Sequence, residues 1–337
     1  MTRNHLLQLA RAVAISAAAM TCAAATADAP ASAQRLNPII SLLEQKQPVM
    51  GLYAPSNRRP GGNAAAEATK PKTPTELARE TVAYKLSDFV FDGTMEHKYD
   101  ETYPVFAAYA KALGKENHLS KKPHPHISYP MVVKMHEIAP DPVLAAKHIS
   151  EQLDLGVSGI MFVQVESAEE LSQGIAAMRY PANGGIRRDS VGSAPAYWGV
   201  SKKDYRRKAD VWPLNPNGEL INWVVIESKD GLQNVREIAA VKGLGVLIPG
   251  IGTLRGVFST TDASGKRTVD EAAWENAIQQ VLSACKEFNV PCGIPATAEQ
   301  IELRMQQGFS VFIMNWGDAG FKTIDVGRKA SGRPLPN

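Results

Sequence analysis

Short apolar runs recur along the chain, and most are followed by a longer segment in which apolar residues return with helical spacing. Eight of the runs are too short for helices and are bounded by polar residues, a pattern typical of strands buried on both faces of a parallel sheet. They cover residues 49–53, 86–91, 131–135, 159–163, 222–226, 245–248, 292–294 and 309–314. Eight strands that alternate with helices predict a single α/β domain, a (β/α)8 TIM barrel over residues 34–337.

Helices are expected between these strands. Two further stretches show no periodic spacing of apolar residues. The expected helices cover residues 37–44, 75–84, 101–113, 141–155, 168–179, 229–241, 271–288, 298–307 and 318–328. Thr75 is the expected N-cap of the second helix. Residues 54–74 are rich in Pro, Gly and Ala and predict a flexible insertion. Residues 180–220 predict a long irregular loop, and a connection of that length is usually functional.

A doubly wound open sheet is the alternative fold. It is less favoured because no glycine-rich phosphate loop follows an early strand. One glycine loop does follow a strand, at residues 249–252, but it lacks the third glycine of a dinucleotide-binding motif. The sequence also gives no sign of the helix that such a motif requires after the loop.

Composition and the N-terminus bear on location and partners. The chain has 337 residues and a formal net charge of +3, with no long basic block that would indicate nucleic-acid binding. Arg3 and Arg11 precede an Ala-rich run, and a small-residue cleavage site lies just before Gln34. Residues 1–33 therefore predict a cleaved signal peptide and export to a periplasm-like space. No second apolar stretch is long enough for a membrane span.

Cys285 and Cys292 lie at the end of an expected helix and the start of the next expected strand. An oxidising compartment permits a disulfide between them. Buried free thiols are common at such positions, so two structural thiols are the favoured interpretation and a disulfide is the second one. Two cysteines without a clustered histidine do not make a zinc site.

Polar residues gather where the expected strands end, and the carboxyl ends of barrel strands form the active face of such folds. These residues are Asp92, Glu96, His97 and Asp100 after the second strand, Lys134 and His136 at the third, Glu227 at the fifth, and the loop 249–254 after the sixth. Gly250 and Gly252 would let the backbone approach a small anion. A base, a cation and a carboxylate suit stabilisation of an enolate formed beside a carboxylate, with His97 moving the proton.

Each of these residues also has a structural interpretation. Glu227 could instead cap the following helix. His97 could cap a helix, and Lys134 could reach solvent from its strand end. His136 and Glu137 fit solvated loop positions. The Trp and Tyr side chains of residues 180–220 are more often packing residues than a substrate platform.

Several short motifs follow one another in a specific order. They are residues 88–91 with 95–97, residues 177–181 with 185–187, residues 225–227, and the loop 249–254. Together they resemble the HpcH/HpaI aldolase/citrate lyase family over roughly residues 37–333. The resemblance implies a (β/α)8 barrel, often a hexamer that exchanges its last helix between protomers. It implies retro-aldol cleavage of a 4-hydroxy-2-oxo acid to pyruvate, or a relative of it, and an aldehyde.

The resemblance also implies roles for single residues. Glu96 and His97 match the Glu-His pair of the family, with His97 as the acid and base. Glu227 matches a ligand of a divalent metal, which would be Mg²⁺, Mn²⁺ or Co²⁺. Lys134 stands where the family has an Arg, and Thr253 where it has the second metal ligand, an Asp. The implied substrate-binding residues are Gly250, Gly252, Thr253 and Arg187.

Three hypotheses on function follow. The leading one is an exported carbon–carbon lyase that acts on a small 2-oxo acid and forms a homo-oligomer. The second is a catalytically degenerate barrel that binds a small carboxylate or an aromatic compound, because a hydroxyl at Thr253 is a far weaker metal ligand than a carboxylate. The third is a lyase that forms a Schiff base on Lys134, which requires an amine with a depressed pKa.

Overall fold

The computed structural model describes residues 34–57, 71–116 and 118–334. The predicted signal peptide, residues 1–33, lies outside the described residues. So do residues 58–70 of the predicted insertion. The remaining chain forms one unit from Gln34 onward.

All eight predicted strands are present and they pair in parallel. They are β1 (Val49–Tyr53), β2 (Val90–Asp92), β5 (Met131–Lys134), β6 (Gly159–Phe162), β8 (Leu220–Ile226), β9 (Val246–Pro249), β12 (Gly293–Pro295) and β13 (Val311–Met314). The pairing runs β12-β13-β1-β2-β5-β6-β8, and β9 pairs with the other side of β8. One isolated parallel bridge, Leu247 with Cys292, joins β9 to the segment entering β12. The fold is therefore α/β, with a curled parallel sheet.

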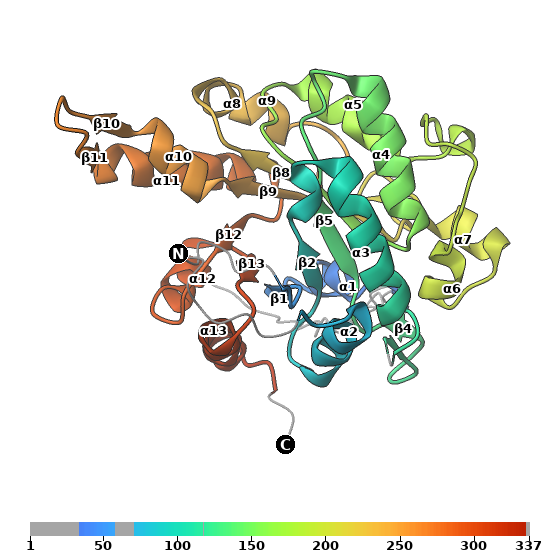
Figure 1. The fold of residues 1–337 in the computed structure, drawn as a ribbon. Coiled ribbons are helices and arrows are strands. Elements are labelled where there is room, and N and C mark those ends of the chain that lie inside the picture. The colour runs from blue at the N-terminus through green and yellow to red at the C-terminus, as the bar shows by residue number, and fades with distance from the viewer. Residues whose placement is uncertain (1–33, 58–70, 117, 335–337) are drawn as a thin grey trace, which may run out of the picture. The chain divides into compact units, whose positions relative to one another are not determined.

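Helices follow most of these strands. They are α1 (Pro38–Glu44), α2 (Pro74–Ala83), α3 (Tyr99–Leu113), α4 (Pro142–Asp154), α5 (Ala168–Met178), α8 (Lys229–Gln233), α9 (Val235–Ala239), α10 (Ile251–Val257), α11 (Glu271–Phe288), α12 (Ile301–Gln307) and α13 (Asp318–Ala330). Figure 1 shows α3, α4 and α5 on the outside of the strands. Two small hairpins are added, β3 (Leu119–Ser120) with β4 (His126–Ile127), and β10 (Ser259–Thr261) with β11 (Arg267–Val269). Among the described residues, no helix combines the length and the apolarity that crossing a membrane requires.

Two predictions about helices are wrong. The N-cap of α2 is Thr73 and not Thr75, because Thr73 and Glu76 form a reciprocal capping box and Pro74 suits the first turn. The predicted helix 229–241 is two short helices. Asn234 ends α8 and begins α9, and its side chain donates to the carbonyl of Glu166.

The segment 180–220 is also more regular than its sequence suggests. It holds a 3-10 turn (Pro181–Asn183), α6 (Ala194–Trp198), α7 (Lys202–Lys208) and the short strand β7 (Val211–Trp212). Trp198 and Tyr205 are buried and their rings meet edge to face, with centroids 4.8 Å apart. These short elements form because their aromatic residues pack on the domain, so the packing interpretation of these two rings is confirmed.

The inside of the curled sheet is filled by side chains that alternate along the strands. Phe89, Phe91 and Trp223 form an aromatic group there, and Ile39 and Ile40 of α1 belong to the same buried cluster. Gly51 of β1 has no room for a side chain, because an added Cβ would lie 2.4 Å from the Phe89 ring. The interior is a packed core and not a channel.

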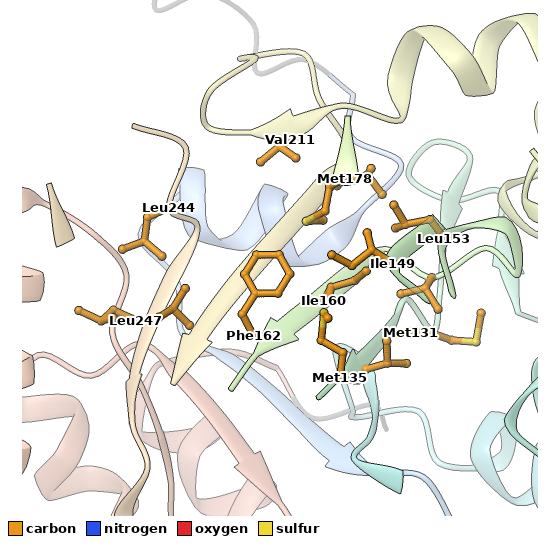
Figure 2. Packing of buried hydrophobic residues seen from close by; sticks show 14 of the residues in the cluster. Met131, Met135, Ile149, Leu153, Ile160, Phe162, Met178, Val211, Leu244 and Leu247 are labelled. Atoms are coloured by element: carbon orange, nitrogen blue, oxygen red, sulfur yellow. The ribbon is translucent and has the colours of Figure 1, made fainter. Parts of the chain in front are cut away.

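A second core lies between the strands and the helices outside them. Figure 2 shows Ile160 and Phe162 of β6 among Ile149, Leu153 and Met178 of the covering helices α4 and α5. All five side chains are fully buried. Removing such side chains from a packed core costs about 2–5 kcal/mol each, so this layer holds the strand ends in place.

Cys285 and Cys292 form a disulfide, with their Cα atoms 5.7 Å apart, so the favoured prediction of two free thiols is wrong. Asn289 ends α11 in the left-handed conformation and turns the chain back on the helix. This turn brings the two Cα atoms to a separation that a disulfide spans, which the spacing of the cysteines alone did not reveal.

Candidate active site

The carboxyl ends of the parallel strands bring several chemical groups together. Tyr53 is the last residue of β1, Lys134 is the last residue of β5, and Glu227 directly follows β8. Glu96 ends a short 3-10 turn, η1 (Thr94–Glu96), that follows β2. Because these strands are parallel neighbours, residues far apart in the sequence meet at one edge of the sheet.

Lys134 and Glu96 form an ion pair, with Nζ 2.9 Å from Oε2. Both side chains are largely buried, at 18% and 19% exposure. Burial by itself lowers the pKa of Lys134, but the charge and hydrogen bond of Glu96, helped by the charge of Glu227, raise it above its ordinary value. Glu96 therefore holds Lys134 as an ammonium group, and the alternative in which this lysine reaches solvent is wrong.

Glu227 is buried and does not cap the following helix. The N-cap of α8 is Ser228, whose hydroxyl accepts from the N–H of Gly231 at 3.0 Å. The Glu227 carboxylate instead accepts the Thr253 hydroxyl on Oε1 at 3.0 Å, and the Gln164 N–H on Oε2 at 3.3 Å. These two donors hold the carboxylate at the carboxyl end of β8, so the capping interpretation of Glu227 is wrong and its role in a site stays a prediction.

The glycine loop after β9 differs from its prediction. The helix α10 follows it directly, with Gly250 as N-cap, so the expectation that no helix follows is wrong. A Cβ on Gly250 would lie 2.3 Å from Cγ of Glu227. Gly250 therefore makes room for the Glu227 side chain. Gly252 is exposed in the first turn of α10, with open space around it.

His97 lies one residue beyond Glu96, and its side chain is exposed. Its carbonyl accepts from the hydroxyl of Thr102, 3.4 Å away. The N-cap position of α3 is taken by Lys98, so His97 does not cap that helix. The imidazole is open to solvent, one residue along the chain from Glu96, and its role as acid and base stays a prediction.

Arg187 is not part of this group. Its side chain is fully buried and donates to Asp154 at 3.0 Å and to the Tyr205 hydroxyl at 3.1 Å. The guanidinium lies over the rings of Tyr180 and Tyr205, at 4.5 and 5.5 Å from their centroids. Asp154 ends α4, whose last turn lies at the amino-terminal edge of the sheet. The structure therefore places Arg187 in a buried structural cluster, away from the predicted substrate site.

Tyr53 was not predicted as a site residue. Its ring meets the edge of Phe91 at 4.8 Å, and an added Cβ on Gly93 would touch both Tyr53 and Lys134 at 3.6 Å. Burial raises the pKa of Tyr53, the charge of Lys134 partly opposes this, and the charges of Glu96, Asp92 and Glu227 raise it further. Its place as the last residue of a strand is the one signal that could have identified it.

Gln164 was also missed. Its backbone adopts the left-handed conformation, with φ of 50°, and this turn directs its N–H at Glu227. Its side chain donates to Glu137 at 2.7 Å, so Glu137 has a partner at the rim of the site. Sequence patterns do not reveal a single residue with positive φ when that residue is not glycine.

His136 is paired with a second histidine, His148 of α4, at 2.7 Å between Nε2 and Nδ1. Tyr99 stacks on the His148 ring with centroids 3.6 Å apart. Burial, and then the charge of His136, hold the pKa of His148 below its ordinary value. His136 is therefore only partly exposed and has a side-chain partner, so its predicted solvated position is wrong.

The donors do not fit a divalent metal held by the protein's own side chains. In the described parts of the chain, no three His, Cys, Asp or Glu side chains are grouped as a metal site would need. Glu227 is the carboxylate at the implied position, and its neighbour there is the hydroxyl of Thr253. Hard divalent cations prefer several carboxylate or carbonyl oxygens, so one carboxylate and one hydroxyl are a weak ligand set.

Comparisons with known proteins agree with this fold. The family model described as HpcH/HpaI aldolase/citrate lyase matches residues 118–317. A hydroxypyruvate/pyruvate aldolase of Delftia acidovorans is 31% identical over 266 residues, which are 78% of this chain and 80% of that protein. Another hydroxypyruvate/pyruvate aldolase, of Paraburkholderia phytofirmans, is 27% identical over 260 residues, covering 77% of this chain and 82% of that protein.

A solved structure supports the fold. It is an HpcH/HpaI aldolase/citrate lyase family protein from Burkholderia cenocepacia J2315, with a TM-score of 0.59 and 21% sequence identity. The match covers 87% of this chain and 97% of that one. A likeness at this identity concerns the arrangement of helices and strands, which is the curled parallel sheet described above.

Proposed function

Because the chain belongs to the HpcH/HpaI aldolase/citrate lyase family, we propose that it is a carbon–carbon lyase of the aldolase type. Its substrate class is a small 4-hydroxy-2-oxo acid, which is cleaved to a pyruvate-type acid and an aldehyde. The observation that carries the proposal is the Lys134–Glu96 ion pair beside Glu227 at the carboxyl ends of the strands.

The residues of the site support the following reaction. His97 takes the proton of the C4 hydroxyl, the C3–C4 bond breaks, and its electron pair moves to form the enolate of the 2-oxo acid while the aldehyde leaves. The Lys134 ammonium faces the negative charge that develops on the enolate oxygen. His97 then returns the proton to C3, which gives the neutral methyl or methylene group. Glu96 and Tyr53 orient Lys134.

The state of Lys134 argues against Schiff-base chemistry. An amine that attacks a carbonyl must lose its proton, and enzymes achieve this by lowering the pKa of the lysine. Glu96 raises the pKa of Lys134 instead. The proposal therefore uses Lys134 as a positive charge and not as a nucleophile.

The family resemblance implies a divalent metal on Glu227, and such an ion would supply further positive charge for the enolate. The poor fit of the donors is the reason that no step above depends on it. Metal content of the purified mature protein, measured for wild type and Glu227→Gln, tests this point directly. A stoichiometric ion that Glu227→Gln loses would place metal chemistry in the reaction.

A turnover assay tests the lyase proposal. The mature protein is incubated with a panel of 4-hydroxy-2-oxo acids, with and without Mg²⁺, Mn²⁺ or Co²⁺, and pyruvate release is measured. Proton exchange at the methyl group of pyruvate is followed in parallel, because it needs only enolate formation. Absence of both turnover and exchange under all conditions contradicts the proposal.

A second candidate function is a binding protein for a small carboxylate or aromatic compound. It is favoured by Thr253, which satisfies Glu227 as a neutral hydrogen-bond donor where a catalytic metal ligand is implied. Thermal shifts with such ligands that do not change on adding a chelator, together with absent turnover, support it. A gain in metal affinity in Thr253→Asp would instead indicate that the rest of a metal site is intact.

Export, assembly and barrel closure complete the proposal. Export to the periplasm is supported by the pattern of residues 1–33 and by the Cys285–Cys292 disulfide, which an oxidising compartment allows. Cell fractionation and an N-terminal sequence that begins at Gln34 test it.

The proposal also includes a homo-oligomer, which light scattering tests. Closure of the sheet as a complete (β/α)8 barrel is supported by the Leu247–Cys292 bridge, and slow exchange of the Leu247 amide proton tests it.

A further inference from the structure

A second polar cavity lies at the opposite, amino-terminal edge of the sheet. It has a volume of about 400 Å³ and is lined by Lys85, Ser87, Asp88, Ser128, Arg328 and Arg333, here called the basic pocket. Asp88 precedes β2, Ser128 precedes β5, and Arg328 belongs to α13. Asp88 and Ser128 thus lie on segments that enter strands and Arg328 on the last helix, whereas Lys134 and Glu227 lie where strands end.

Two arginines of this pocket share one carboxylate. Arg333 binds Asp88 through both guanidinium nitrogens, at 2.6 and 2.5 Å. Arg328 approaches Asp88 only to 3.7 Å. Its guanidinium donates instead to main-chain oxygens, that of Leu86 at 3.2 Å and that of Pro334 at 2.8 Å. Among the residues that the structure describes, Arg328 therefore has no carboxylate of its own within hydrogen-bond distance.

The side chains of the two arginines and of Asp88 are largely buried. The side chains of Arg328, Arg333 and Asp88 are 12%, 13% and 8% exposed. Burial, and then the charge of Arg333, lower the pKa of Arg328, while Asp88 and the weaker influences of Tyr84 and Asp325 only partly oppose this. One carboxylate thus offsets only part of the cost of burying two guanidinium groups.

A lysine adds a third positive charge to the basic pocket. Lys85 lies over the ring of Tyr129, with Nζ 5.8 Å from its centroid. With Arg328, Arg333 and Lys85 against Asp88, the charged side chains that line the pocket sum to two positive charges. A purely structural ion pair needs only one cation for each carboxylate. Serine hydroxyls at Ser87 and Ser128 supply neutral groups at the same cavity.

We propose that the basic pocket binds a small oxyanion with two negative charges, of the phosphate or sulfate kind. Guanidinium groups match the geometry of such oxygens and bind them through charge-assisted hydrogen bonds. The cavity exceeds the size of a bare ion, so the anion is either free or the terminal group of a small organic ester. This site is separate from the proposed reaction site, because the two lie at opposite edges of the sheet.

Calorimetric titration of the mature protein with inorganic phosphate and with sulfate tests the proposal, with chloride at equal ionic strength as reference. Saturable binding of one anion per chain is expected. Lys85→Gln and Arg328→Gln should each weaken it about tenfold, as loss of a charge-assisted contact does. The exposed Lys85 is the safer change for folding, and Lys202→Gln on α7, outside the pocket, is the matched control and should bind like wild type.

Three results would overturn the proposal. One is an absence of saturable binding beyond the chloride response. Another is equal weakening by Lys202→Gln and Lys85→Gln, which indicates general charge screening. The third is binding that Lys134→Gln abolishes and Lys85→Gln spares, which places the anion in the reaction site. Titration with glycerol 3-phosphate then identifies the source: tighter binding than phosphate indicates an ester ligand, and equal binding indicates the free ion.

Discussion

The two edges of the curled sheet carry opposite imbalances of charge. At the carboxyl edge one lysine, Lys134, lies within reach of the carboxylates of Glu96 and Glu227, and its pKa is raised. At the amino edge two arginines, Arg328 and Arg333, divide the single carboxylate of Asp88, and the pKa of Arg328 is lowered. Carboxylates thus compensate the positive charge of Lys134 at one edge, whereas the positive charge of Arg328 is only partly compensated at the other.

The difference shows how each edge can act. Lys134 is held in place by Glu96, so a ligand meets a cation whose direction is already set, which is what preorganised electrostatic catalysis requires. The positive charge of Arg328 is only partly compensated by Asp88, so an anion that binds there gains more electrostatic energy than one that binds at Lys134. The carboxyl edge suits a reaction, and the amino edge suits binding.

The largest expected effect comes from removing the cation at the carboxyl edge. Lys134→Gln should lower kcat/KM for 2-oxo acid cleavage about 10²–10³-fold, because one preorganised group facing a developing oxyanion contributes that much. Steady-state kinetics measure it. The control is Lys229→Gln, an exposed lysine two residues after Glu227, which should keep wild-type activity. Equal activity of Lys134→Gln and the control would remove Lys134 from the reaction.

The amino edge should respond unequally to loss of its two arginines. Arg333→Gln should cost about 1.5–3 kcal/mol of unfolding free energy, because Asp88 loses its bidentate charged partner. Arg328→Gln should cost less, since the remaining Arg333–Asp88 pair is then balanced. Urea unfolding of both variants measures the difference. Similar losses of unfolding free energy in the two variants, or a larger loss in Arg328→Gln, would show that Asp88 does not pair mainly with Arg333.

Gly250 and Gly252, at the start of α10, allow a direct comparison at the carboxyl edge. Gly250→Ala should destabilise the protein by about 1–3 kcal/mol, because its Cβ would lie 2.3 Å from Glu227. Gly252→Ala meets open space in α10 and should be neutral or slightly stabilising. Thermal unfolding compares them. If both variants behave alike, Gly250 does not make room for Glu227.

The smallest effect is a pH dependence from the His136–His148 pair. The pKa of His148 is lowered, so the unfolded chain takes up this proton at a higher pH than the folded one. Stability from His148 is therefore complete above about pH 6.5 and declines as the pH falls below that value.

Thermal unfolding between pH 7.5 and 5 measures this decline. It should be shallower in His148→Gln than in wild type, and His124→Gln, in the β3–β4 hairpin, should follow wild type. An unchanged slope in His148→Gln would show that the buried pair does not titrate as described.

Much of this arrangement was predictable from residue patterns. The eight apolar runs are the eight strands, and Lys134 and Glu227 do lie at strand ends. What failed was mostly local in scale: the cap at Thr73, the break at Asn234, and the helix after Gly250. At each of these positions one hydrogen bond or one short helix overrides the average tendency of the surrounding residues.

The sequence by itself determined the order of elements and which side chains leave the strands at the carboxyl edge, because periodicity and strand direction depend on near neighbours. Only the tertiary structure decided which groups meet. Lys134 pairs with Glu96, Cys285 bonds to Cys292, Arg187 is buried with Asp154, and Arg333 reaches Asp88 across 245 residues. These contacts depend on the curl of the sheet and on the packing of its helices, which bring distant segments together by burying apolar surface and not through any local signal in the chain.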